Sequence, residues 1–510
     1  MTSLCAQWSL DTLLSPWAVN SVPAIAVSGV NLDSRMVEQG DVYLAIEGAT
    51  THGMHFAEKA VETGAVAVAC SAASKDEFSD VVSRLEQRNV PVVIVNELTS
   101  CCGAIASRYY HEPDQSMTIV AVTGTDGKTS VCRFIAQSLN AISQSCGYIG
   151  TLGWGVGDAL NDTALTTPDS VTLRRLLASM RDQGAKFIAL EASSHGIAEG
   201  RLDGLSLDVA VLTNLGRDHL DYHGSIEAYR AAKERLFGWE SLQAVVLNAD
   251  DAMGRDLIRD ITHVARIAYS TSDSQCGHVE TNNDSRFSAL YATNIDTDDS
   301  GLAFDLVSGV VKQRISTTLL GRFNVDNLLA CYGSLIACGV AANDAIHGIG
   351  SVTPVAGRME RLGGGDKPTV VIDFSHTPNA LTVAIEAVRV HCTNRLWVVF
   401  GCGGDRDKGK RAPMASASEA ADHIVLTDDN PRTERSETII NDVMQGFADH
   451  HKVTVIADRA DAIRHAINRA EPGDLVLIAG KGHEDYQIVG AQKHHFSDRE
   501  QALAVLGSAT

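Results

Sequence analysis

The chain has 510 residues, a length that predicts about three domains, and a formal net charge of −21, which argues against a nucleic-acid-binding surface. Its 11 cysteines are scattered without a CxxC pair or zinc-ligand spacing, so we expect neither disulfides nor zinc. No Lys or Arg precedes Arg35, and no apolar run could span a bilayer. We therefore expect no targeting peptide, no membrane contact and a cytoplasmic protein.

The first predicted domain, residues 1–114, is a small α/β unit. Apolar runs at 65–69 and 92–95 read as strands, with helical segments between them. Asp33-Ser34-Arg35, which follows another short apolar run, is compatible with an ordinary turn or with a binding role. The polar stretch 111–116 contains a proline and is predicted to be a linker.

A phosphate loop is predicted at residues 119–130, around which the rest of the chain is organised. The β-branched run 119–122 stops at Gly124 and Gly127, and Lys128-Thr129-Ser130 opens a helical pattern. In such a turn the backbone N–H groups and the helix dipole face phosphates, the lysine reaches the outer phosphates, and the Thr hydroxyl serves magnesium. Val122 stands five positions before Gly127, where the general motif has glycine, so a generic search would miss this loop.

The second predicted domain, residues 115–355, alternates strands and helices as a parallel sheet requires. Strands are expected at 186–191, 208–214 and 244–248, each ending in a polar residue where ligands of open α/β sheets bind. A hairpin about Ser308-Gly309 is expected to be a β insertion packed on the main sheet.

The third predicted domain, residues 356–510, repeats the α/β pattern and should have a site of its own. Strands are predicted at 369–373, 396–400, 423–427 and 475–479. Each is followed by a polar or Gly-rich turn, among them 401–406, 428–432 and 480–484.

Several residues of the second domain could hold magnesium, which prefers oxygen ligands. Thr129 supplies one hydroxyl, and Glu191, at the end of its strand, is the best carboxylate candidate. His219 lies just past another strand, in the cluster 214–224. From spacing alone, Lys233 within the helical run 226–237 would be an ordinary surface lysine.

Taken together, these motifs resemble the Mur ligase family, and within it the branch that adds the third residue to UDP-N-acetylmuramoyl-L-alanyl-D-glutamate. The resemblance covers almost the whole chain and keeps the family's order. Its parts are residues 32–35, 124–130, 166–168, 191–196, 214–224, 321–327 and 357–360, with the turns of the third domain. It implies a three-domain α/β architecture: a small UDP-binding domain, a central P-loop ATPase domain with a parallel sheet and β insertion, and a C-terminal Rossmann-like domain.

The resemblance also implies the nucleotide and metal site. ATP would be bound by Gly124, Thr125, Asp126, Gly127, Lys128, Thr129, Ser130, Asn324 and Asn327. The magnesium ligands would be Thr129, Glu191, His219 and Lys233, the last modified to a carbamate (N6-carboxylysine). The catalytic set would be Lys128, Glu191, His219, Lys233, Arg358 and Asp373, the last two brought to ATP when the domains close.

The substrate residues follow from the same resemblance. The UDP-muramoyl dipeptide would be held by Leu32, Ser34, Thr166, Thr167, Ser193, Glu199 and Arg201, with Glu199 standing where the family usually has glutamine. Diaminopimelate would be held by Arg406, Asp429, Asn430, Pro431, Arg432, Gly480 and Glu484. Physically, Arg432 offers a planar fork to a carboxylate, while Asp429 or Asn430 can bind an ammonium.

The function expected from this resemblance is ATP-dependent formation of an amide through an acyl phosphate, with ATP and Mg²⁺ as cofactors. The partners are expected to be small-molecule substrates only, UDP-N-acetylmuramoyl-L-alanyl-D-glutamate and meso-diaminopimelate, and the chain is expected to be a monomer. Three alternatives stay open. The amino acid could be L-lysine, the chain could be a folylpolyglutamate-type ligase, or it could be a non-catalytic ATP-binding homologue.

Overall fold

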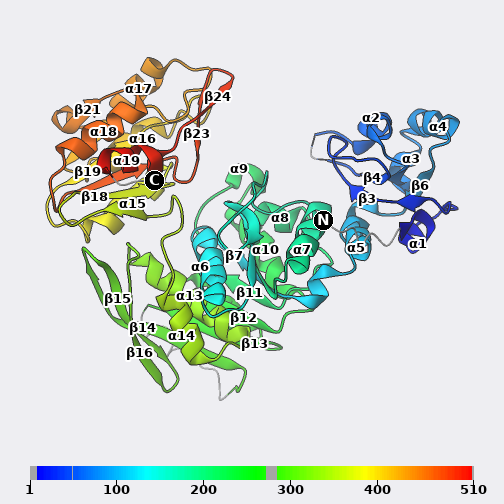
Figure 1. Ribbon diagram of the computed structural model, residues 1–510, viewed down its shortest axis with the longest axis horizontal. Helices are drawn as coiled ribbons and strands as arrows, with labels where there is room; N and C mark the ends of the chain where they lie inside the picture. The colour runs from blue at the N-terminus through cyan, green and yellow to red at the C-terminus, as the bar shows by residue number, and fades with distance from the viewer. Residues whose placement is uncertain (1–7, 49, 272–283, 508–510) are drawn as a thin grey trace.

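The computed structural model describes residues 8–48, 50–271 and 284–507. Three groups of strands and helices follow one another along the chain (Figure 1). In this view the first group lies to the right, the central group in the middle and the last group at the upper left. No helix of the described residues is long and apolar enough to cross a membrane, and the nine described cysteines are free.

The first group contains a parallel four-stranded sheet in the order β3-β4-β5-β6. Its strands are β3 (Gly29–Asn31), β4 (Asp41–Ala45), β5 (Ala67–Ser71) and β6 (Val92–Val95), beside the two-stranded pair β1 (Trp8–Ser9) and β2 (Ala26–Val27). Its helices are α1 (Leu10–Leu14), η1 (Gly53–Phe56), α2 (Ala57–Thr63), α3 (Ala72–Lys75), α4 (Ser79–Gln87) and α5 (Leu98–Tyr109).

The stretch predicted as a linker is anchored rather than free. It contains the 3₁₀ helix η2 (Pro113–Ser116), in which Pro113 and Asp114 are buried. The Asp114 carboxylate accepts a hydrogen bond of 2.8 Å from the backbone N–H of Ser206. The linker therefore packs on the central group because its acidic side chain satisfies a backbone donor there.

The central group is built on a ten-stranded sheet in the order β16-β15-β14-β13-β12-β11-β7-β10-β8-β9. Its strands are β7 (Thr118–Thr123), β8 (Cys146–Gly150), β9 (Gly153–Val156), β10 (Phe187–Glu191), β11 (Val209–Leu212), β12 (Ala244–Asn248), β13 (Ala265–Ser270), β14 (Phe287–Asp298), β15 (Gly301–Ser308) and β16 (Val311–Thr317). Its helices are α6 (Lys128–Ala141), α7 (Ser170–Asp182), α8 (Ser194–Ala198), α9 (Leu220–His223), α10 (Ile226–Glu234), η3 (Arg235–Gly238), α11 (Ala252–Asp260), α13 (Phe323–Ala337) and α14 (Ala342–Gly350).

Strand β7 shows why its sequence is uniformly apolar. Val120 and Val122 belong to the core cluster that includes α6 and α13, whereas Ile119 and Ala121 belong to the cluster on the opposite face with α7 and α11. A parallel strand buried on both faces needs an unbroken apolar run. Because β10, β7 and β11 are adjacent and parallel, their carboxyl ends lie together at one edge of the sheet.

The predicted hairpin exists, but its expected position was wrong. β15 pairs antiparallel with both β14 and β16, and β14 pairs parallel with β13. The hairpin thus extends the main sheet at its edge instead of packing on a face. The unpaired edge of β13 accounts for this, because a further strand satisfies its backbone hydrogen bonds.

The last group contains a six-stranded sheet in the order β17-β18-β22-β19-β20-β21, parallel apart from β17. Its strands are β17 (Glu360–Gly363), β18 (Thr369–Asp373), β19 (Leu396–Phe400), β20 (His423–Leu426), β21 (Val453–Val455) and β22 (Leu475–Ala479), with the separate hairpin β23 (Tyr486–Val489) and β24 (Gln492–His495). Its helices are α15 (Pro378–Arg389), α16 (Arg411–Ser418), α17 (Ser436–Met444), η4 (His450–Lys452), α18 (Arg459–Arg469) and α19 (Asp498–Leu506).

Candidate active site

The phosphate loop joins the end of β7 to the start of α6. Gly124 has φ 151° and Gly127 has φ 83°, both in the region that favours glycine. A Cβ on Gly124 would lie 1.8 Å from Thr213 Oγ1, and one on Gly127 would lie 2.6 Å from Asn327 Oδ1. The two glycines are thus required by backbone conformation and by close packing.

The residues after β11 brace this loop. The N–H of Thr125 donates to the Asn214 carbonyl at 2.9 Å, and the N–H of Asp126 donates to Asn214 Oδ1 at 3.0 Å. The Thr213 hydroxyl donates to the Asp126 carbonyl at 2.6 Å. Asp126 therefore contributes its backbone to the loop, as Ser130 does in the first turn of α6.

Two lysines converge on one carbonyl of the loop. Lys128 Nζ donates to the carbonyls of Gly124 (2.9 Å) and Thr125 (2.8 Å), and Lys233 Nζ donates to Gly124 O at 2.6 Å. Lys233 is 1% exposed, and its ammonium lies 4.3 Å from the centre of the Tyr229 ring. Burial, followed by the charge of Lys128, lowers the pKa of Lys233 to about 6. Lys233 is therefore a buried residue of α10 that contacts the loop, and not a surface lysine.

Glu191 ends β10 directly beside the start of α6. Its side chain is fully buried and accepts hydrogen bonds from the hydroxyls of Thr129 (3.0 Å) and Tyr148 (2.6 Å) and from the N–H of Thr151 (3.0 Å). Burial, and then the charge of Glu191, raises the pKa of Tyr148 well above its ordinary value. Thr129 and Glu191 together form a buried oxygen pair at the magnesium position expected from the sequence.

His219 directly precedes α9 with φ 53°, and its side chain is 48% exposed. Its ring lies 4.8 Å from that of His195, and its Nε2 lies 3.3 Å from Asp218. His195 also contacts the rings of Tyr222 (4.1 Å) and His223 (5.5 Å). The structure thus places His219 in an aromatic cluster beside α8, not in a contact with Glu191.

The oxygen donors of this region fit Mg²⁺ in chemical type. No group of three or more His, Cys, Asp or Glu side chains that could hold a metal ion occurs in the part of the chain that the structure describes. The expected set contains only one carboxylate, Glu191, with Thr129, His219 and Lys233. A carbamate on Lys233 would supply the second negative group.

Asn324 and Asn327 are both buried in the first turns of α13. Asn327 Nδ2 donates to Asn324 Oδ1 at 2.9 Å, and Asn324 Nδ2 donates to the Leu320 carbonyl at 2.7 Å. The contact distance between Asn327 and the Gly127 position brings this pair against the phosphate loop. The two asparagines thus lie beside the phosphate loop, and their contact with a nucleotide stays a prediction.

Arg358 lies just before β17, and Asp373 is the last residue of β18. The Arg358 guanidinium stacks 4.6 Å from the Phe374 ring centre, and its Nε is buried without a hydrogen-bond partner. Asp373 accepts from the N–H groups of Met359 and Ser375, each at 2.9 Å. Asp373 therefore holds the segment that carries Arg358.

Five of the seven residues expected to hold the muramoyl dipeptide gather near Glu191. The Thr167 hydroxyl donates to the Glu191 carbonyl at 2.7 Å and accepts from the N–H of Ser193 at 3.0 Å. The backbone carbonyl of Thr167 accepts from Arg201 at 2.7 Å. The Thr166 and Thr151 hydroxyls lie 3.1 Å apart.

Glu199 pairs with Arg201, accepting from its Nε at 3.0 Å and its Nη2 at 2.5 Å. Glu199 also accepts from the Tyr222 hydroxyl at 3.3 Å. Leu32 and Ser34, the remaining two residues of the expected set, follow β3 in the first group, where Ser34 is buried. The structure does not bring them into contact with the other five.

The residues expected to hold the amino acid lie in the turns that follow β19, β20 and β22. A Cβ on Gly403 would lie 3.0 Å from Arg432 Nη1 and 3.8 Å from Arg406 Cγ, so the two arginines flank this glycine. Arg432 has φ 52° and is fixed by donating through its N–H to the Ile488 carbonyl at 3.0 Å.

The acidic residues of this group lie in the turns 428–432 and 480–484. Asn430 Nδ2 donates to Glu484 Oε2 at 3.2 Å, and the N–H of Gly480 donates to the Asp373 carbonyl at 3.0 Å. The carbonyl of Pro431 packs against Gly404, where a Cβ would lie 2.0 Å from it. The loop 429–432 is therefore packed closely against Gly404.

Four residues of the site were not identified from the sequence: Tyr148, Thr151, Tyr229 and Lys481. Tyr148 and Thr151 reach Glu191 because β8 lies next to β10 in the sheet, an order that strand patterns do not reveal. Lys481 lies between two glycines in the turn 480–484. This Gly-Lys-Gly pattern is the sequence feature that could have identified it.

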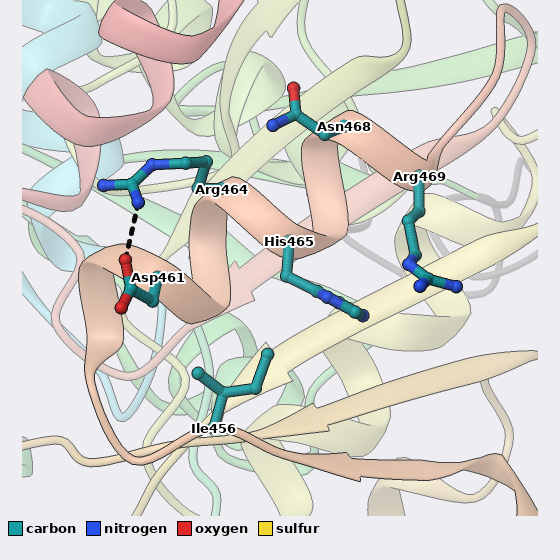
Figure 2. Close-up of a pocket in the computed structure, with 6 residues that line it drawn as sticks. All are labelled: Ile456, Asp461, Arg464, His465, Asn468 and Arg469. Atoms are coloured by element: carbon teal, nitrogen blue, oxygen red, sulfur yellow. Dashed lines mark hydrogen bonds and ion pairs between the residues drawn. The ribbon is translucent and has the colours of Figure 1, made fainter.

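A separate cavity of about 390 Å³ lies between the segment after β21 and helix α18 (Figure 2). It is lined by Ile456, Asp461, Arg464, His465, Asn468 and Arg469. Arg464 points away from His465 to form an ion pair of 2.6 Å with Asp461. None of the residues predicted to be functional lines this cavity.

A parallel sheet whose central strand ends in a phosphate loop, with a lysine and a threonine at the helix N-terminus, defines a nucleotide-binding protein of the P-loop class. Family models match three consecutive parts of the chain: the Mur ligase family catalytic domain at residues 26–110, the Mur ligase middle domain at 122–335, and the Mur ligase glutamate ligase domain at 357–482. The chain belongs to the Mur ligase family.

Relatives and solved structures agree with this assignment. The UDP-N-acetylmuramoyl-L-alanyl-D-glutamate–2,6-diaminopimelate ligase of Pseudomonas aeruginosa is 43% identical, over 95% of this chain and 96% of its own. The enzyme of the same name from Ectopseudomonas mendocina is 42% identical, over 97% and 99%. A solved structure of a ligase of that name aligns with a TM-score of 0.69 and 34% identity, covering 98% of this chain and 99% of its own.

Proposed function

We propose that this Mur ligase adds meso-diaminopimelate to the D-glutamate of UDP-N-acetylmuramoyl-L-alanyl-D-glutamate at the expense of ATP, in the synthesis of peptidoglycan precursors. The names of the full-length relatives support this reaction. The observation that carries it is the chain of contacts from Arg432 to Asn430 and from Asn430 to Glu484, because these turns offer a cationic fork and acidic groups to a zwitterion.

The first half of the reaction activates the substrate carboxylate. Arg201, Thr167 and Ser193 position the dipeptide so that its D-glutamyl side-chain carboxylate attacks the γ-phosphorus of ATP, and ADP leaves. Lys128 leaves the carbonyls of Gly124 and Thr125. Together with the loop N–H groups, it stabilises the negative charge on the transferring phosphate. Mg²⁺ held by Thr129, Glu191, His219 and carbamylated Lys233 would neutralise phosphate charge when bound.

The second half forms the amide. The acyl phosphate is attacked by an amino group of diaminopimelate, whose far carboxylate lies at Arg432, and the tetrahedral adduct expels inorganic phosphate. Because acyl phosphates hydrolyse, the site must exclude water, and we propose that the last domain closes with Arg358 towards ATP. The buried, unpartnered Nε of Arg358 supports a role that is completed by a ligand.

Carbamylation of Lys233 is part of the proposal. Carbon dioxide reacts with a neutral amine, and burial favours the neutral form of this lysine. The product would be a carboxylate-like group next to the phosphate loop.

The remaining expectations are also proposals. They comprise the domain limits 1–114, 115–355 and 356–510, a cytoplasmic monomer, and small molecules as the only partners. Separate sheets in the three groups of elements support the limits.

The decisive experiment measures phosphate release from ATP with the UDP-muramoyl dipeptide, comparing meso-diaminopimelate with L-lysine in wild type and Arg432→Ala. We expect strong preference for diaminopimelate and its loss in the variant. Equal use of lysine would overturn the assigned amino acid. No release with either amino acid would favour a non-catalytic homologue.

A further inference from the structure

Lys481 is the most buried charged group of the amino-acid pocket, and no role has yet been assigned to it. It is the second residue after β22, and its side chain is fully buried. Its ammonium donates to Asn430 Oδ1 at 3.0 Å and to the Tyr486 carbonyl at 2.7 Å. The same ammonium lies 3.3 Å from Asp429 Oδ1 and 3.7 Å from Glu484 Oε2.

We propose that Lys481 is the positioning residue of the diaminopimelate pocket, which neutralises one of the two carboxylates, Asp429 and Glu484, and fixes both of them around Asn430. The inference rests on the proposed function and extends it to the way in which this pocket recognises a zwitterion. It assigns Lys481 no direct contact with the reacting atoms.

Counting charges explains why a lysine is needed here. Asp429 and Glu484 contribute two negative charges, and Lys481 contributes one positive charge, which leaves a net charge of minus one for an incoming ammonium. Arg459 and Asp498 face the turn from α18 and α19, but they form their own buried ion pair at 2.7 Å and cancel. On the cationic side, Arg432 donates through Nη1 to the Gly404 carbonyl at 2.8 Å, a neutral acceptor that leaves its positive charge uncompensated for the carboxylate of the substrate.

Hydrogen bonding explains how the same lysine sets geometry. Asn430 is held through both ends of its amide, since its oxygen accepts from Lys481 and from the N–H of Ile488 (2.9 Å) while its nitrogen donates to Glu484. Lys481 thereby determines which end of the amide faces Glu484. A buried lysine held by this many acceptors loses little further entropy when the substrate binds.

The test is a charge-balance cycle built from Lys481→Met, Asp429→Asn and the double variant. Phosphate release is measured while diaminopimelate, ATP and the UDP-muramoyl dipeptide are varied in turn. We expect each single variant to raise KM for diaminopimelate at least tenfold and to change the other two KM values less than twofold. The double variant restores the net charge of minus one, so its KM for diaminopimelate should be at least threefold lower than that of Lys481→Met.

A lysine that only fills space predicts a different result. The double variant would then bind diaminopimelate no better than Lys481→Met, and that outcome would overturn the proposal, as would an unchanged KM in Lys481→Met. If Lys481→Met does not fold, Asp429→Asn alone decides, because an unchanged KM for diaminopimelate in that variant also contradicts the charge count. Wild type without any diaminopimelate-dependent release would instead refute the proposed function.

Lys493→Met is the matched control. Lys493 is an exposed lysine of the neighbouring hairpin, whose ammonium lies 3.8 Å from the Tyr486 ring centre. Its removal takes one positive charge from the same region without touching Asp429 or Glu484. We expect KM for diaminopimelate to stay within twofold of wild type.

Discussion

Glu191 allows the stability and the activity of the site to be separated by two substitutions. Its carboxylate is fully buried and accepts from the Tyr148 hydroxyl, from the N–H and hydroxyl of Thr151, and from the Thr129 hydroxyl. In Glu191→Gln the amide oxygen can keep the bonds from Tyr148 and the Thr151 N–H, while its NH₂ faces two hydroxyls that can rotate to accept. In Glu191→Ala all four donors lose their acceptor.

The expected magnitudes differ accordingly. A buried donor left without a partner costs about 1–3 kcal/mol. Tyr148 and the Thr151 N–H cannot turn to other acceptors, so Glu191→Ala should lower the free energy of unfolding by about 2–4 kcal/mol, with water in the vacated space limiting the loss. Glu191→Gln removes a buried charge and should lie within about 1 kcal/mol of wild type. Both variants lose the negative charge, so both should lose ligase activity about 100-fold or more.

Hydrogen–deuterium exchange of peptides from β8 and β10 measures this stability separately from the rest of the chain, and phosphate release measures activity. Equal destabilisation by the two substitutions would refute the assignment of the hydrogen bonds. Near-normal activity of Glu191→Gln would refute the need for a negative charge at this position. A Thr151→Val variant serves as a control, because it removes one hydroxyl and leaves the charge in place.

Three further predictions follow from the same region. Lys233→Ala should lose activity about 100-fold or more and regain part of it with added short carboxylates such as acetate, whereas Lys233→Arg should not be rescued. In wild type, ¹³C NMR with ¹³C-bicarbonate should detect the carbamate, and the absence of its signal would contradict the modification. Gly124→Ala should destabilise the central sheet or abolish ATP binding, because its Cβ would collide with Thr213, and nucleotide titration checks this. Glu199→Gln should lower KM for the UDP-muramoyl dipeptide several-fold without changing KM for ATP, because it removes the charge that pairs with Arg201; a higher KM would show that the pair orients Arg201 instead.

The sequence alone predicted the class of fold because its strands are buried on both faces. Parallel strands form at the runs 119–122, 244–248, 396–400 and 475–479. A continuous apolar, β-branched run of this length is typical of a strand that is buried on both faces of a sheet. The polar residues after these strands also gathered at sheet edges, as the geometry of parallel sheets requires. The family and the fold were confirmed by the comparisons.

Contacts that depend on strand order were beyond the sequence. Tyr148 reaches Glu191 only because β8 lies beside β10, and the hairpin β15–β16 extends the sheet only because β13 has a free edge that β14 can occupy. Lys233 is the sharper case, because a lysine in a helix is ordinarily exposed, and nothing in its local sequence marks it as buried. Its burial comes from α10 packing over the phosphate loop, a contact between segments about a hundred residues apart.

The position of Val122 explains why the phosphate loop can depart from the general motif without strain in its backbone. Val122, at the position where the general motif has glycine, is the fifth residue of β7 and lies fully buried, paired with Glu191 on one side and Val211 on the other. The chain is still extended at this point, so no left-handed backbone is needed and a β-branched residue is favoured. The turn begins two residues later, where Gly124 and Gly127 supply the positive φ angles. A valine here continues the buried strand, and the register pairs it with Glu191, so the carboxylate lies beside the last residues of β7, just before the loop begins.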